Sequence, residues 1–139
     1  MTESFTPVVV QPDVVAEALA FLRPALAARE EPYATGVTVR ASIPNPRPAG
    51  PLVVLRPAGG SSQVLSVDRP RLDAQVWHRD EHSAASLAQL VRGLLRSMPG
   101  IGAVRAVEDF TGPVSIPDPE SGQARYLLTV EMTTRGVMA

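Results

Sequence analysis

The sequence predicts an α+β fold, a mostly antiparallel sheet with two amphipathic helices packed on one face. Two segments carry apolar residues at helical spacing, and six shorter segments read as strands, most of them with apolar and polar residues in alternation. The predicted order of elements is α-β-β-β-β-α-β-β. Most connections between the strands are short, which is typical of antiparallel neighbours in an α+β layer.

The first helix is predicted over residues 13–29, directly after Pro12. Its apolar positions recur at steps of three and four residues and so form one stripe along a helix. They are Val15, Leu19, Leu22 and Leu26. Pro24 lies inside this segment and has no N–H to donate to the preceding turn, so we expect a kink or an early stop near residues 22–23.

Four strands are predicted between the helices. They cover residues 37–43, 52–55, 64–67 and 72–77. The first and last of these alternate between apolar and polar side chains, whereas the second is a continuous apolar run typical of a strand covered on both faces. Gly59 and Gly60 belong to a segment rich in turn-forming residues, 57–62, which predicts the turn of a hairpin whose returning strand starts at Val64.

The second helix is predicted to begin at a cap, Asp80 or Ser83, and to end before Pro99 and Gly100. Its apolar stripe comprises Leu87, Leu90, Val91, Leu94, Leu95 and Met98. Two strands complete the fold, at residues 103–108 and 124–133. The remaining segments are predicted to be a flexible N-terminus at about 1–11 and long proline-rich loops at about 44–51 and 110–123.

Composition indicates one folded domain, 1–139, and disfavours several functions. Hydrophobic residues make up 45% and charged residues 19%, which is too apolar for a disordered chain. All 13 cations are arginine, so lysine Schiff-base chemistry and a P-loop lysine are excluded, and the absence of cysteine excludes thiolate nucleophiles. The net charge of -1, with neither half of the chain basic, disfavours nucleic-acid binding. We expect no membrane span and no signal peptide, and therefore an intracellular protein when it is made.

One short motif is spelled like a metal site. His78, Glu81 and His82 match the H-x-x-E-H pattern of zinc proteases. That chemistry needs both histidines on one helical face and a third ligand, but here the motif bridges a predicted strand end and a helix start. The favoured interpretation is a charged turn in which Asp80 caps the helix, with no catalytic, cofactor or metal residue.

Trp77, the only tryptophan, lies on the strand face opposite Leu72, Ala74 and Val76. A tryptophan on that second face indicates that something covers the face, such as another subunit. The alternative is that the strand end bends and Trp77 closes the core under the second helix.

The order and spacing of several segments resemble the tail terminator proteins of long-tailed, siphovirus-type actinobacterial phages. The resemblance covers residues 12–136 and rests on the following segments. They are Pro12-Asp13 before the first helix, Ile43-Pro44 followed by Arg47-Pro48, residues 52–56 followed by Gly59-Gly60, residues 68–72 running into Val76-Trp77, the helix at 85–95, residues 125–130, and Arg135-Gly136.

This resemblance implies a small, non-enzymatic α+β subunit without a cofactor. Such subunits assemble as a homo-oligomeric ring, usually of six copies, on the last ring of the tail tube. The ring stops tube growth and forms the joining surface for the head connector, while genomic DNA passes through its lumen without sequence-specific binding. The expected location is the head-proximal end of the virion tail, after assembly in the host cytoplasm.

A ring of head-to-tail contacts needs two different patches on each subunit. Exposed sheet edges and proline-stiffened loops are suitable for them, especially residues 44–51, 57–62 and 112–122. The candidate interface residues are Arg47, Arg56, Ser61, Asp73, Trp77, Pro113 and Pro117. A near-neutral charge also suits a channel through which DNA must slide without sticking.

Two alternatives remain open. One is another ring-forming neck or tail-completion protein, which differs from a terminator in the partner that it binds. The other is a small zinc-dependent hydrolase or ligand-binding domain that uses His78, Glu81 and His82. Tight binding of one zinc ion, lost in His78→Ala, would support that second alternative.

Overall fold

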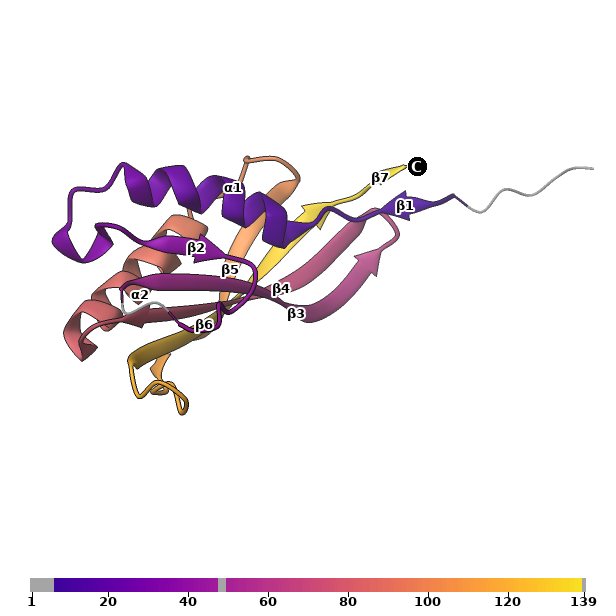
Figure 1. Cartoon of the computed structure of the whole chain (residues 1–139). Helices are drawn as coiled ribbons and strands as arrows, with labels where there is room; N and C mark the ends of the chain where they lie inside the picture. Colours follow the sequence, from indigo (N-terminus) through magenta and orange to yellow (C-terminus); the bar gives the residue numbers. More distant parts are fainter. Residues whose placement is uncertain (1–6, 48–49, 139) are drawn as a thin grey trace, which may run out of the picture.

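A computed structural model describes residues 7–47 and 50–138 and has the predicted α+β class (Figure 1). Its helices are α1 (Val14–Ala27), the short 3-10 helix η1 (Pro32–Ala34) and α2 (Glu81–Leu95). Its strands are β1 (Val9–Val10), β2 (Thr38–Arg40), β3 (Leu52–Val64), β4 (Val67–His78), β5 (Val104–Ser115), β6 (Ala124–Arg135) and β7 (Val137–Met138).

The main sheet has the strand order β2-β3-β4-β6-β5, and all of its pairs are antiparallel except β2 with β3. Both long helices pack on one face of this sheet, as predicted (Figure 1). The core between these layers combines apolar side chains of α1 and α2 with alternate residues of the strands. Fully buried members include Leu22, Leu55, Leu72, Leu87, Val91 and Met132.

Helix α1 begins where the sequence predicts, because the Asp13 carboxylate accepts a hydrogen bond from the Ala16 N–H at 3.1 Å. Of the kink or early stop predicted near residues 22–23, the early stop is wrong, since the helix continues to Ala27. Leu22 and Leu26 are both buried on the core side of α1, whereas Pro24 is exposed. Packing of the apolar stripe therefore outweighs the hydrogen bond that proline cannot make.

The structure corrects the prediction of four strands between the helices, because β3 runs through the predicted turn at 57–62 and the described part of this segment forms only β2, β3 and β4. The chain instead reverses at Leu65 and Ser66. Gly59 and Gly60 adopt positive φ angles of 82° and 136° within β3, where the register against β4 shifts. The two glycines thus form a bulge rather than a turn.

The last two strands of the main sheet are longer than predicted. The predicted loop at 110–123 is shortened at its start, because β5 extends to Ser115. In the predicted N-terminal tail, residues 1–6 lie outside the described residues and Val9–Val10 pairs with Val137–Met138. The loop at 44–51 is described except for 48–49 and contains a cis Asn45–Pro46 bond. No helix within the described residues is long and apolar enough to cross a bilayer.

Candidate interaction surfaces

Trp77 lies on the second face of the sheet, as the strand alternation predicts, but the chain itself covers it. Its side chain is fully buried in a small cluster with Leu52, Val54 and the partly buried Ile43. The indole Nε1–H donates to Asp118 Oδ2 at 2.9 Å, from the loop between β5 and β6. The expectation that something covers this face at Trp77 is therefore confirmed, with the chain itself as the cover, whereas the alternative that Trp77 closes the core under α2 is wrong.

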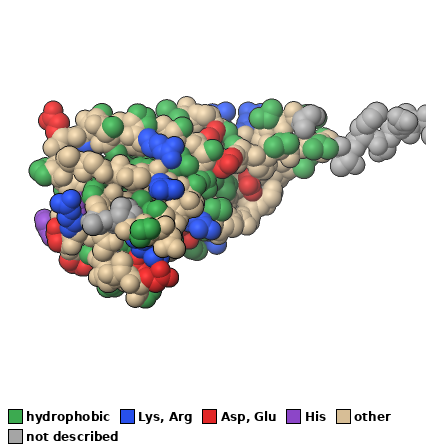
Figure 2. Space-filling view, viewed as in Figure 1, with side chains coloured by type: hydrophobic (Ala, Val, Ile, Leu, Met, Phe, Trp, Pro, Cys, Tyr) green, Lys and Arg blue, Asp and Glu red, His purple; other side chains and the backbone are tan. Residues whose placement is uncertain are grey.

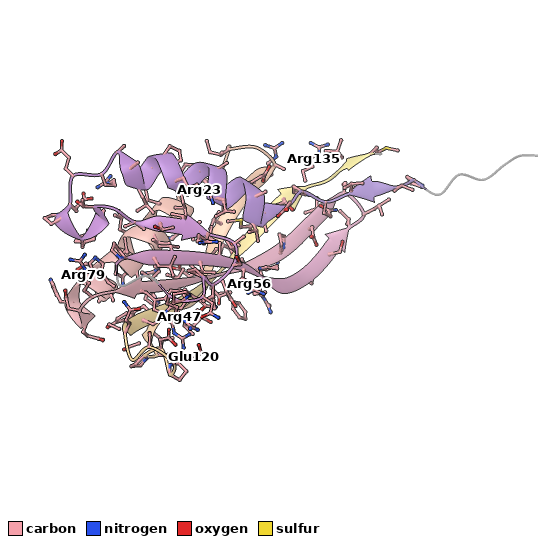
Figure 3. The ribbon with its side chains drawn as sticks, viewed as in Figure 1. Arg23, Arg47, Arg56, Arg79, Glu120 and Arg135 are labelled. Atoms are coloured by element: carbon pink, nitrogen blue, oxygen red, sulfur yellow. The ribbon has the colours of Figure 1, made fainter. Side chains whose placement is uncertain are left out.

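Arg47 and Asp118 join the two loops that close over the Trp77 cluster. Arg47 Nε lies 2.7 Å from Asp118 Oδ2, and its Nη1 pairs with Glu120, as Figure 3 shows for Arg47 and Glu120. The Asp118 side chain is 1% exposed and that of Arg47 is 16% exposed. Both residues therefore hold the loops against the sheet, and Arg47 offers a partner little free surface.

The Asp118 carboxyl has a pKa below its ordinary value of 3.8. Burial alone raises this pKa, but hydrogen bonds from Trp77, the Glu120 N–H and the Ser121 hydroxyl, together with the charge of Arg47, outweigh burial. A group whose folded-state pKa is lowered stabilises the fold above its unfolded-state pKa, and loses that contribution as the pH falls through the folded-state pKa.

We expect Asp118→Asn to lower the free energy of unfolding by about 2 kcal/mol at neutral pH, because it removes charge-assisted hydrogen bonds. The difference from wild type should shrink as the pH falls below about 4, where the wild-type carboxyl itself becomes protonated. Urea denaturation at neutral pH and at about pH 3 measures both effects. Glu108→Gln, at an exposed carboxylate, is the control. A difference that stays constant with pH would contradict this role of Asp118.

An exposed apolar surface projects beyond α1 at one end of the molecule, where β1, β7 and the β3–β4 turn lie together (Figure 1). Hydrophobic side chains gather on this narrow end in Figure 2. We call it the apolar tip, and it comprises Val8, Val10, Val64, Leu65, Val137 and Met138, each 57–70% exposed. Two hydrogen bonds link its parts, from the Gly136 N–H to Ser66 O at 2.8 Å and from Gln11 Nε2 to Leu65 O at 3.2 Å.

A second exposed apolar surface follows the free edge of the main sheet. It consists of Phe110, Val114 and Ile116, which are 42–53% exposed, and we call it the edge patch. The guanidinium of Arg71 lies 3.8 Å from the centre of the Phe110 ring and pairs with Glu131 at 3.3 Å. The edge patch and the apolar tip involve different elements, so one chain carries two separate apolar surfaces.

Most of the remaining predicted interface residues lie near one of these two regions. Pro113 lies within β5 and Pro117 follows Ile116, so both flank the edge patch. Asp73 accepts a hydrogen bond from Thr129 Oγ1 at 2.6 Å and lines a hollow of about 220 Å³ beside Val114. Arg56 lies opposite Asp73 in the β3–β4 register and is exposed. Ser61 is exposed on β3 toward the apolar tip.

The apolar tip was not predicted from the sequence. Val64 was assigned to a strand, and Val137 and Met138 follow the last predicted strand without a pattern of their own. A run of exposed valines has no local sequence signal that separates it from a buried strand. Only the pairing of β1 with β7 shows that these side chains gather at one end.

A groove of about 550 Å³ lies on the outer side of α1, against the loop that leads into β5. We call it the α1 groove, and its lining includes Glu17, Ala20, Phe21, Pro24, Ile101 and Gly102. Glu17 Oε1 accepts a hydrogen bond from the Ala103 N–H at 3.2 Å. Its Oε2 is buried and has no hydrogen-bond partner among the described residues. The groove is thus apolar, with one carboxylate at its wall.

The three residues of the H-x-x-E-H pattern do not converge. His78 ends β4, where its Nε2 lies 3.1 Å from Tyr33 O and its Nδ1 accepts from the Arg79 N–H. Glu81 accepts hydrogen bonds from Ser115 and Tyr126, while Asp80 caps α2 as predicted. Among residues 7–47 and 50–138, no three metal-binding side chains lie close enough to hold an ion.

No protein-family model matches this chain, and no curated protein sequence is significantly similar to it.

Proposed function

We propose that this protein is the tail terminator of a long-tailed phage, a subunit that forms a ring on the end of the tail tube. The observation that carries the proposal is the presence of two separate exposed apolar surfaces, the apolar tip and the edge patch, on one small chain. Monomeric proteins seldom expose several large hydrophobic side chains together unless a partner covers them.

The positions of these surfaces favour assembly, because the two lie on different parts of the chain and each needs its own cover. The apolar tip projects from one end of the molecule, and the edge patch follows a free edge of the sheet (Figure 1). Contacts between unlike surfaces of identical chains generate rings when the rotation closes. The near balance of 13 cations and 14 anions supports a lumen that does not hold DNA tightly.

Light scattering over a range of concentrations, with negative-stain images of the same sample, tests ring formation. A closed ring of six copies has six times the chain mass of 14.8 kDa. Tail tubes assembled from the tube protein of the same genome then test the function, and we expect the ring on one end of each tube. Binding to the head connector and not to the tube would instead assign the chain to the neck.

A monomer at every concentration that also fails to bind tube ends would overturn the proposal. A monomer that forms a cap only on tubes would support it, because the tube end then serves as the template for ring closure.

A further inference from the structure

The α1 groove suits an occupant whose long apolar side chain ends in a hydrogen-bond donor. Its walls are largely apolar, from Phe21, Pro24 and Ile101, and its one polar side chain is the carboxylate of Glu17, an acceptor. Glu17 Oε2 is shielded from water without a hydrogen-bond partner among the described residues. An unpaired buried carboxylate oxygen costs free energy, which a donor brought by an occupant would recover.

Two backbone features add to this acceptor character. Pro24 has no N–H, so the carbonyl of Ala20, four residues earlier in α1, lacks its usual helical donor. Gly102 has a φ of 54°, and a Cβ atom there would lie 2.6 Å from Glu17 Oε1. Glycine therefore lets the loop lie directly against the carboxylate. The groove therefore places a carboxylate between apolar walls, and the carbonyl of Ala20, one of its lining residues, lacks its i+4 helical donor.

The apolar tip carries the complementary chemistry. Beside its exposed valines lies Arg135 at the end of β6, labelled in Figure 3. Arg135 is exposed, and its guanidinium makes no ion pair with any residue of the described ranges. Arginine presents donors at the end of an apolar stem, and no lysine exists in this chain to do so.

We propose that the apolar tip of one copy, with Arg135, docks into the α1 groove of the next copy. This contact rests on the proposed ring function and names the two surfaces that join neighbouring subunits. The tip projects beyond α1 in its own chain (Figure 1), so it is free to reach the groove of a neighbouring copy. The fit combines an apolar protrusion bearing a cation with an apolar groove bearing an anion, as a head-to-tail contact requires.

Cysteine cross-linking tests this pairing, because the natural chain contains no cysteine. One sample carries Ile101→Cys in the α1 groove, and a second carries Val137→Cys in the apolar tip. When the two samples are mixed and oxidised, we expect a disulfide between position 101 of one chain and position 137 of another. The matched control replaces the first sample with Val114→Cys in the edge patch, since Val114 and Ile101 are 44% and 46% exposed. A stronger cross-link to position 114, or none to position 101, would overturn the pairing.

Charge removal tests the role of the two ionised groups. Glu17→Gln keeps an oxygen for the Ala103 N–H, and Arg135→Gln keeps a polar side chain of moderate length. Each should lower the yield of the 101–137 cross-link about tenfold, the effect of losing one charge-assisted hydrogen bond. Glu108→Gln, an exposed change outside the groove, should leave the yield unchanged. Equal yields in all variants would remove Glu17 and Arg135 from the contact.

The outcomes separate this inference from the ring proposal. Rings that form without the 101–137 cross-link would leave the proposed function standing and show that other surfaces join the subunits. A 101–137 cross-link in a protein that neither closes rings nor binds tube ends would support the contact and overturn the terminator function.

Discussion

Replacing Trp77 with alanine is expected to lower the free energy of unfolding by about 3–5 kcal/mol, the range for truncating a large buried aromatic side chain. Trp77 is fully buried and packs with Leu52 and Val54 on the face of the sheet away from the helices. Its removal also leaves the buried Asp118 carboxylate without its indole donor. The cavity and the lost hydrogen bond act in the same direction.

Urea denaturation followed by far-UV circular dichroism measures this effect, because the variant has no tryptophan fluorescence to follow. Trp77→Phe is the matched variant, since it keeps a buried aromatic ring while it removes the indole N–H together with part of the ring volume. We expect it to cost about 1–3 kcal/mol. A loss below about 1 kcal/mol for Trp77→Ala would show that the loops do not pack on this face as described.

Gly60→Ala is expected to destabilise the protein by about 3 kcal/mol or more, because it combines backbone strain with a clash inside the sheet. Gly60 has a φ of 136°, a conformation that residues with a Cβ atom rarely adopt. An added Cβ would also lie 2.7 Å from the Cα of Pro70 on the neighbouring strand. Backbone atoms of β4 cannot move aside without shifting the β3–β4 pairing.

Gly93→Ala is the control for this substitution. Gly93 lies within α2, where an added Cβ meets no atom within 4 Å. Alanine there should stabilise the protein by about 1 kcal/mol through helix propensity. Thermal unfolding of both variants should therefore move the melting temperature in opposite directions. Two small changes of the same sign would mean that the bulge at Gly60 tolerates a side chain.

Local patterns predicted the type of most elements because each pattern reflects one buried face. The stripe through Leu87 and Val91 identified α2, and Asp80 identified its first turn. The same chemistry misled at Gly59 and Gly60, since glycine pairs serve both tight turns and bulges. The choice depends on the register between β3 and β4, which neighbouring residues alone do not determine.

The candidate surfaces were harder to predict because they combine residues that are distant in the sequence. Strand alternation placed Trp77 on the correct face, but its cover depends on Asp118, which only the folded chain brings to it. The α1 groove likewise joins Glu17 to the loop at Gly102. The side chains of the apolar tip are exposed because the paired strands β1 and β7 project from the molecule, and residue composition alone does not indicate this.

The strand order has a consequence for how fast the chain folds. β3 with β4, and β5 with β6, are neighbours in both sequence and space, so each pair can close over a short loop. β4 and β6 also pair, although α2 and β5 lie between them in the chain. Closing that longer segment costs chain entropy before its contacts form. We therefore expect docking of the two hairpins, which α2 connects, to limit the folding rate.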